Sequence, residues 1–143
     1  MTRVCTFFGH RECPSALRPA LDRELRRLVN AGVTQFYLGH HGQFDALVLA
    51  SLQQLKTEFP HISYAVVLSR CNATVGKEHD GENTLYPEEV ACVPPRFAID
   101  RRNRWMLQQA DIVVTHTVYP WGGAARFADL AKRKGKTVIN LAL

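Results

Sequence analysis

Long hydrophobic runs are absent from this 143-residue sequence. No apolar stretch approaches the roughly 20 residues that a helix needs to cross a bilayer. The N-terminal segment also lacks the basic, apolar and small-residue regions that follow one another in a secretory signal peptide. We therefore expect no membrane-spanning helix, no membrane partner and a cytoplasmic location.

Cysteine patterns typical of metal or disulfide frameworks are also absent. The four cysteines are widely spaced, and the sequence contains neither a Cys-x-x-Cys pair nor two histidines at zinc spacing. We expect free, mostly buried thiols, no metal and no resident cofactor.

Acidic residues are fewer than basic ones, with 13 Asp and Glu against 18 Lys and Arg, so the net charge is +5. This excess suits an anionic ligand, although solvated helix faces such as Arg26-Arg27 and Lys132-Arg133-Lys134 explain part of it. Aromatic residues do not alternate with the basic ones, as single-stranded nucleic acid binding favours. Nucleic acid is therefore the weaker expectation for a partner.

What the sequence does contain is a regular alternation of short apolar segments and helical patterns. The segments are too apolar for a sheet with one wet face and indicate strands buried on both faces, as in a parallel sheet. We predict an α/β fold, namely a Rossmann-like doubly wound parallel sheet of about five strands in the order 3-2-1-4-5, with helices on both faces. The expected strands cover residues 3–8, 35–38, 64–68, 112–115 and 137–141, and the expected helices 15–30, 44–58, 99–109 and 124–134.

Residues 69–95 interrupt this alternation within what we expect to be a single domain, 1–143. The stretch is rich in glycine and proline and has little periodicity. Loops of this length are usually functional or disordered. We predict a loop excursion with one helical turn near Pro87-Glu88-Glu89, and leave open whether it closes over a ligand as a lid.

Three of the predicted strands end in glycine turns. Ligands of open parallel sheets bind beyond the carboxyl ends of the strands, where the strand order reverses. The turns are Gly9-His10-Arg11, Gly39-His40-His41-Gly42 and Trp121-Gly122-Gly123. The third turn opens a helix whose free N–H groups would face an anion, so residues 118–129 are the predicted floor of a phosphate site.

Other residue types near these turns suit a nucleotide. Arg11 could meet a phosphate as a fixed bidentate cation, and Asp45 could accept hydrogen bonds from ribose hydroxyls. At most one of the adjacent His40 and His41 would face the ligand for acid–base chemistry. The full predicted binding set is Gly9, His10, Arg11, Gly39, Gly42, Asp45, Tyr86, Arg96, Arg102, Trp121, Gly122, Gly123, Ala124 and Arg126, with Tyr86 and Trp121 as stacking platforms.

Three motifs together resemble the SLOG superfamily, which joins DprA/Smf proteins, YpsA-like proteins and LOG phosphoribohydrolases. They are Phe8-Gly9-His10-Arg11, the turn from Gly39 to Asp45, and Ala110-Asp111-Ile112-Val113-Val114 followed by Trp121-Gly122-Gly123. The sequence is most similar to small bacterial YpsA-type members that carry Trp-Gly-Gly-Ala. The resemblance implies a Rossmann-like domain that binds nucleotides or nucleotide-derived molecules, and it allows a homodimer.

The same resemblance separates binding from catalysis. LOG enzymes carry Pro-Gly-Gly-x-Gly-Thr-x-Glu-Glu, whereas here Arg126 stands for the threonine and Ala128 for the first glutamate, and Asp129 alone is acidic. Arg102 and Met106 match the Arg-Lys-x-x-Met helix of those enzymes. Cleavage of a glycosidic bond needs a placed carboxylate, so the catalytic half of the motif is incomplete.

Three functions follow from these residues. The first is binding of a nucleotide-like small molecule at the carboxyl edge of the sheet, as a sensor or accessory protein. The second is an N-glycosidase or phosphoribohydrolase acting on a nucleoside phosphate or NAD derivative, with Asp129 as the candidate catalytic residue or a loop carboxylate such as Glu82 or Glu88. The third is single-stranded DNA binding. Whether the protein is an enzyme stays open.

Overall fold

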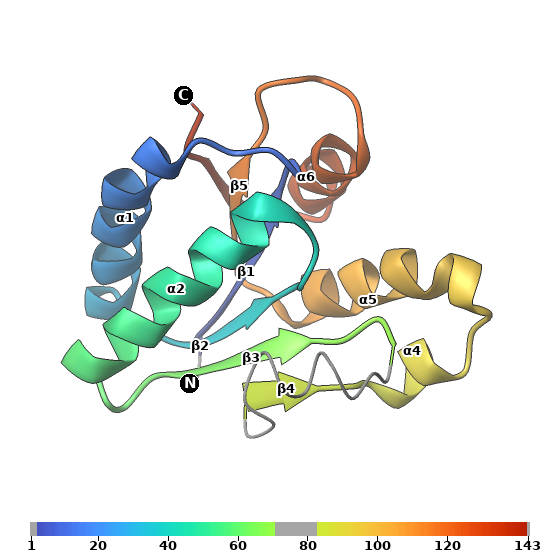
Figure 1. Ribbon diagram of the computed structural model, residues 1–143, viewed down its shortest axis with the longest axis horizontal. Helices are drawn as coiled ribbons and strands as arrows, with labels where there is room; N and C mark the ends of the chain where they lie inside the picture. The colour runs from blue at the N-terminus through green and yellow to red at the C-terminus, as the bar shows by residue number, and fades with distance from the viewer. Residues whose placement is uncertain (1–2, 71–82, 143) are drawn as a thin grey trace.

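The central element of the computed structural model, which describes residues 3–70 and 83–142, is one all-parallel sheet (Figure 1). Its strand order is β4-β3-β2-β1-β5-β6. The strands are β1 (Arg3–Gly9), β2 (Val33–Leu38), β3 (Ser63–Val67), β4 (Thr84–Leu85), β5 (Ile112–His116) and β6 (Thr137–Asn140). The predicted α/β, Rossmann-like fold is confirmed, including the reversal of strand order at β1.

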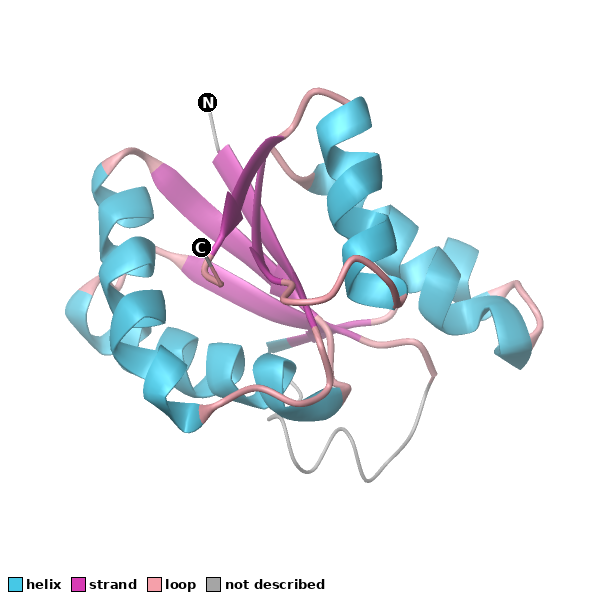
Figure 2. Cartoon of the chain, turned by 90° about the horizontal axis from the view of Figure 1, so that it is seen from above, coloured by secondary structure: helices cyan, strands magenta, loops and turns pink. Residues whose placement is uncertain are grey.

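Helices cover both faces of the sheet (Figure 2), as the sequence predicts. Within the described ranges they are α1 (Arg18–Asn30), preceded by the 3₁₀ turn η1 (Ser15–Leu17), α2 (Gly42–Glu58), α4 (Glu88–Ala91), α5 (Pro95–Gln109) and α6 (Gly123–Arg133). Buried side chains from α1 and α2 pack on one face, and those from α5 and α6 pack on the other. None of the helices in the described part of the chain is long and apolar enough to cross a membrane.

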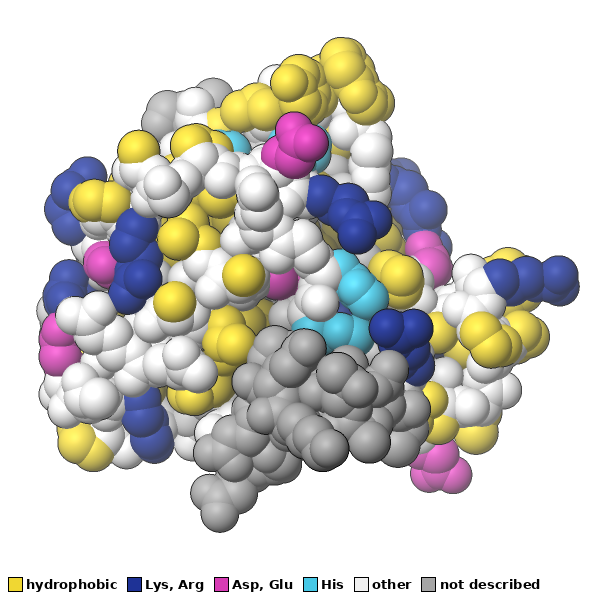
Figure 3. All heavy atoms as spheres, viewed as in Figure 1, with side chains coloured by type: hydrophobic (Ala, Val, Ile, Leu, Met, Phe, Trp, Pro, Cys, Tyr) yellow, Lys and Arg dark blue, Asp and Glu magenta, His cyan; other side chains and the backbone are white. Residues whose placement is uncertain are grey.

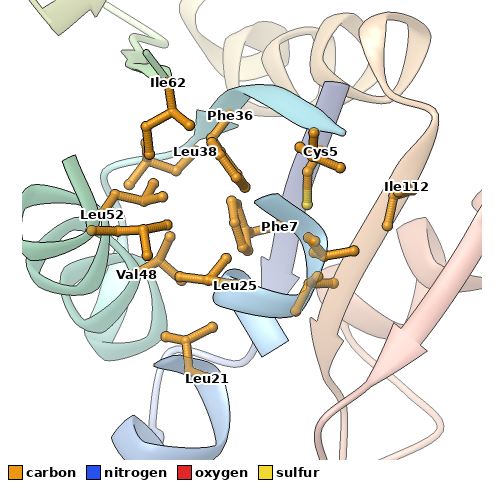
Figure 4. Close-up of a cluster of buried hydrophobic side chains, with 14 of the residues drawn as sticks. Cys5, Phe7, Leu21, Leu25, Phe36, Leu38, Val48, Leu52, Ile62 and Ile112 are labelled. Carbon is orange, nitrogen blue, oxygen red and sulfur yellow. The ribbon is translucent and has the colours of Figure 1, made fainter. Parts of the chain in front are cut away.

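Strand β1 shows why both faces must be covered. Consecutive side chains of a strand point to opposite faces, and Phe7 and Phe8 are both buried. Phe7 stacks against Phe36 at 6.2 Å between ring centroids, on the α1–α2 side, where Figure 4 shows the surrounding aliphatic cluster. Phe8 stacks against Phe127 of α6 at 5.3 Å. Burial of each such ring stabilises the fold by about 1.5–3 kcal/mol, so β1 holds the two helical layers together.

The stretch expected to be a loop excursion contains more regular structure than the sequence suggests. Thr84–Leu85 adds a sixth strand by pairing with Val66 and Val67 of β3. The helical turn expected near Pro87 is confirmed as α4, whose N-cap is Pro87. A two-residue edge strand has no periodicity of its own, which explains why the count of about five strands was one short. Residues 71–82, which include Glu82 and part of the expected loop excursion, lie outside the described residues.

Two helix starts also differ from expectation. Helix α5 begins at Pro95, four residues before the expected start at 99, because a proline in the first turn of a helix loses no intrahelical hydrogen bond. The first helix was expected to begin at residue 15, but Ser15 opens the 3₁₀ turn η1 instead, and α1 begins at Arg18 without a side-chain cap. The remaining boundaries agree with the predictions to within about two residues, as is usual for helix and strand ends.

Candidate functional site

A cleft of about 410 Å³ lies at the carboxyl ends of β1 and β2. Its walls come from the first turns of α2 and α6 and from the middle of α5. Nine members of the predicted binding set line it, namely Gly9, His10, Arg11, Gly39, Asp45, Arg102, Gly122, Gly123 and Ala124. The structure therefore brings together residues from all three glycine turns, because β1 pairs with both β2 and β5.

The N-terminus of α6 forms one wall of this cleft. Gly122 is the N-cap, with φ of 95°, a left-handed conformation that glycine adopts readily and side-chain-bearing residues rarely do. The helix has no side-chain cap and no acidic residue in its first turn. Its first turn therefore offers N–H groups and the positive end of the helix dipole to the cleft without an internal competitor.

Arg102 supplies a buried cation to the cleft. Its side chain is only 3% exposed, and Nη1 donates a hydrogen bond to the carbonyl oxygen of Val67 at 3.3 Å. Nε donates to Oδ1 of Asn103 at 2.9 Å. Burial lowers the pKa of Arg102, and the nearby Asp45 carboxylate partly offsets this. An arginine stays protonated at any ordinary pH, so this site carries a fixed positive charge.

Asp45 is the only carboxylate among the described residues that line the cleft. Its Oδ2 accepts a hydrogen bond from the backbone N–H of His41 at 2.9 Å. Burial raises the pKa of Asp45 to about 6, against the opposing effects of that hydrogen bond and of the Arg102 charge. Asp45 and Arg102 meet at Gly39, where a Cβ atom would lie 2.8 Å from Oδ2 and 2.9 Å from Nη1. Only glycine leaves both groups in place.

His41 is one of the two histidines that line the cleft, and its surroundings keep it uncharged. Burial lowers the pKa of His41 to about 4, and the charges of Arg102, Arg70 and Arg11 add to this, so the ring is neutral near pH 7. Its Nε2 lies 3.2 Å from Oγ of Ser69. Figure 3 shows histidine side chains beside Lys and Arg side chains on this face of the molecule.

His10 serves a different purpose, because its Nε2 accepts hydrogen bonds from the backbone N–H groups of Val118 at 3.1 Å and Tyr119 at 3.3 Å. These bonds tie the turn after β1 to the loop between β5 and α6. Of the adjacent pair, His41 lines the cleft, whereas Nε2 of His40 accepts a hydrogen bond from the Ser69 backbone at 3.2 Å.

Three members of the predicted set lie near the cleft but do not line it. Gly42 opens α2 beside Arg11, whose carbonyl oxygen accepts a hydrogen bond from Gln43 N at 2.6 Å. Tyr86 lines a second cleft instead. Trp121 is 66% exposed and stacks on Tyr119 at 5.0 Å between ring centroids.

The last two members of the predicted set, Arg96 and Arg126, do not line the cleft, and neither does the candidate catalytic residue Asp129. Arg96 is exposed, with its guanidinium 4.8 Å from the centre of the Phe97 ring. Arg126 forms an ion pair with Asp100. Asp129, the candidate catalytic residue, lines a separate depression together with Tyr119 and Lys132. Its role as a catalyst stays a prediction, and the cleft offers Asp45 as the better-placed carboxylate.

Side chains on α5 complete the cleft and were not in the predicted set. Ile99, Asn103 and Met106 line it beside Arg102. Their positions at −3, +1 and +4 relative to Arg102 place them on or next to the same helix face. This helical spacing could have predicted the three residues from the sequence, provided that Arg102 was taken to point into the cleft. No group of three or more His, Cys, Asp or Glu side chains within residues 3–70 and 83–142 could hold a metal ion.

Comparisons with known proteins support the fold and leave the activity open. No protein-family model and no curated protein sequence matches the chain. DNA processing protein A (DprA) from Streptococcus pneumoniae has a similar structure, with a TM-score of 0.72 and 15% identity over 96% of this chain and 49% of DprA. DNA processing protein A from Helicobacter pylori, whose structure concerns its single-stranded DNA binding mode, has a TM-score of 0.66 and 16% identity over 95% of this chain and 63% of that protein.

The likeness to these two proteins is one of fold. This chain spans about half of the first protein and less than two thirds of the second. The likeness confirms the predicted Rossmann-like fold, and the expected relation to the SLOG superfamily stays a prediction. The finer assignment to YpsA-type members stays a prediction.

Proposed function

We propose that this protein binds a phosphate-bearing, nucleotide-derived ligand in the cleft between α2, α5 and α6, as a sensor or accessory protein. The observation that carries the proposal is the uncapped first turn of α6 in a cleft that also holds Arg11 and Arg102. Helix N-termini bind phosphate through free N–H groups and the helix dipole. A buried arginine adds charge-assisted hydrogen bonds that water screens poorly.

Asp45 extends this arrangement beyond a bare phosphate. Its carboxylate, once ionised, can accept hydrogen bonds from a ribose diol, as acidic residues do in other Rossmann-like sites. The surrounding Phe8, Ile99 and Met106 give the cleft an apolar surface suited to the uncharged part of a ligand. These features support a nucleotide rather than free phosphate.

Calorimetry with inorganic phosphate, AMP and ADP-ribose tests the proposal. Arg102→Met removes the buried guanidinium with little change in volume, and we expect it to weaken AMP binding by about 10–100-fold, the effect of a lost charged hydrogen bond. Arg101→Met is the matched control, because Arg101 is exposed and forms its ion pair with Glu89 at 3.9 Å. Circular dichroism would verify folding. Absence of binding to wild-type protein at millimolar concentration would refute the proposal.

Single-stranded DNA binding is the second candidate, favoured by the likeness of the fold to DNA processing protein A. The stacked Tyr119–Trp121 pair, 52% and 66% exposed, adds an aromatic surface, in which Tyr119 extends the stacking platform expected of Trp121. Base stacking on such rings contributes about 1–3 kcal/mol per base. Retardation of labelled oligonucleotides that persists above physiological salt and is lost in Trp121→Ala would favour this candidate.

Glycosidic cleavage has less support than binding. Asp129 is not among the described residues that line the cleft, and Oδ2 of Asp45 already accepts a hydrogen bond from the His41 backbone, which leaves fewer acceptor sites for activating water. Release of free base from AMP that persists in Asp129→Asn and disappears in Asp45→Asn would assign the reaction to this cleft. Release lost in Asp129→Asn alone would instead restore the carboxylate expected from the sequence.

A further inference from the structure

A second cleft, of about 400 Å³, adjoins the first. It lies between the end of β3, α4 and the first turns of α5, and it shares two residues with the first cleft, His41 and Ile99. The two spaces therefore have a common boundary. The phosphate-binding groups Arg11, Gly122 and Gly123 line only the first cleft.

The chemistry of the second cleft differs from that of the first. Its floor is apolar, formed by the buried Val90 and Ala98. Tyr86 presents an aromatic ring from the segment between β4 and α4. Arg70 and Ser69 supply polar groups at one side. A flat ring with polar edges, rather than a second phosphate or an aliphatic chain, fits a space with apolar, aromatic and hydrogen-bonding walls.

His41 lies at the boundary between the two clefts, and its surroundings keep the imidazole neutral near pH 7. A protonated imidazole would add a fourth positive charge to Arg102, Arg70 and Arg11, and burial also opposes its protonation. The neutral ring is held toward Ser69 through Nε2, at 3.2 Å from Oγ. A neutral aromatic ring beside Ile99 lets an uncharged sugar or base pass from one cleft to the other without an unpaired charge.

We propose that the second cleft binds the aromatic base of the nucleotide whose phosphate lies at the N-terminus of α6. This inference rests on the proposed function and adds to it the orientation of the ligand, from α6 across His41 and Ile99 to Tyr86. The base stacks on Tyr86, with its polar edge toward Arg70.

Blocking the second cleft separates the base from the phosphate. Ala91 lines this cleft and is exposed, so Ala91→Trp introduces a large ring without disturbing the core. We measure binding of ribose 5-phosphate and of each of the four ribonucleoside 5′-monophosphates by calorimetry. Wild-type protein should bind at least one nucleotide about tenfold or more tightly than ribose 5-phosphate. Ala91→Trp should abolish that difference and leave ribose 5-phosphate binding unchanged.

Further variants distinguish stacking from a structural effect. Tyr86→Ala should weaken nucleotide binding, whereas Tyr86→Phe should bind the nucleotide as tightly as the wild type, because the ring is needed and the hydroxyl is not. Ala46→Trp, at an exposed position of α2 that lines neither cleft, is the matched control and should change neither affinity.

The outcomes separate the two proposals. Equal wild-type affinities for ribose 5-phosphate and all four nucleotides, or an unchanged difference in Ala91→Trp, would overturn this inference and leave phosphate binding intact. A parallel loss of both affinities in Ala91→Trp would also overturn it. Failure of every probe to bind wild-type protein would overturn the proposed function and, with it, this inference.

Discussion

The two opposite walls of the main cleft are built differently. The wall formed by Gly39, Asp45 and Arg102 is internally bonded and partly buried, and its charged groups already have partners. The wall formed by Gly122 and Gly123 is exposed, and a Cβ atom at either glycine would meet nothing within 4 Å. The first wall is preorganised by the fold, whereas the second is open to solvent and leaves the N–H groups of the first turn of α6 accessible to a ligand.

The largest expected effect comes from placing the same methyl group on each wall. Gly39→Ala puts a Cβ within 3 Å of both Asp45 Oδ2 and Arg102 Nη1, and neither side chain can move without breaking a hydrogen bond. We expect a loss of about 1–3 kcal/mol in the free energy of unfolding, as for other overpacked sites. Gly123→Ala should change it by less than about 0.5 kcal/mol. Urea denaturation measures both, and equal losses would show that the walls do not differ.

A smaller effect concerns the dependence of stability on pH. The folded protein holds a proton on Asp45 between its ordinary pKa of 3.8 and about 6, so this group lowers the free energy of unfolding as pH rises through that window. His41 acts in the opposite direction between about 4 and 6.5, because the unfolded chain binds more protons there. The two slopes oppose each other in wild-type protein.

Removal of one group should reveal the other. In Asp45→Asn the free energy of unfolding should rise between pH 4 and 6.5, and relative to wild type the gain should reach on the order of 2 kcal/mol above pH 6. His41→Asn should show the reverse slope. Chemical denaturation at several pH values checks both variants. Parallel pH profiles for the wild type and the two variants would contradict the assigned environments.

The smallest effect is expected on the exposed side of the cleft. Trp121→Ala should change the free energy of unfolding by less than about 0.5 kcal/mol, because the ring is mostly in solvent and stacks on Tyr119, which is itself exposed. Trp105→Ala is the comparison, since Trp105 is half-buried and contacts Tyr37 edge to face at 5.0 Å. It should cost several times more. A large loss of stability in Trp121→Ala would mean that the Trp121 ring stabilises the fold and is not a surface left open for a ligand.

The sequence pattern predicted the fold correctly wherever the residues of a single strand or turn indicate what packs around it. Phe7 and Phe8 occupy opposite faces of one strand, so an apolar run already indicated a sheet covered on both sides. Gly122 and Gly123 followed a strand and preceded a helix, which indicated an open helix N-terminus. The two-residue strand Thr84–Leu85 had no such pattern, because its pairing with β3 depends on a neighbour distant in sequence.

The sequence pattern could not predict the direction in which individual side chains point. The sequence does not distinguish Arg96, Arg102 and Arg126, but the structure does. Arg96 lies over the Phe97 ring, Arg102 is buried beside Gly39, and Arg126 pairs with Asp100. Helical spacing indicates which residues share a face, but the face that meets the sheet depends on how α5 and α6 pack. For the same reason the sequence could not indicate that Asp129 lines a depression separate from the main cleft.

The amino-acid sequence by itself determined the alternation of strands and helices, the parallel sheet and the three glycine turns at its carboxyl edge, because periodicity and backbone freedom are properties of short segments. Only the tertiary structure decided that Asp45 and Arg102 meet at Gly39, and that a second cleft adjoins the first across His41 and Ile99. These groups come from elements far apart in the chain, and helix packing against the sheet sets their distances and their charge states.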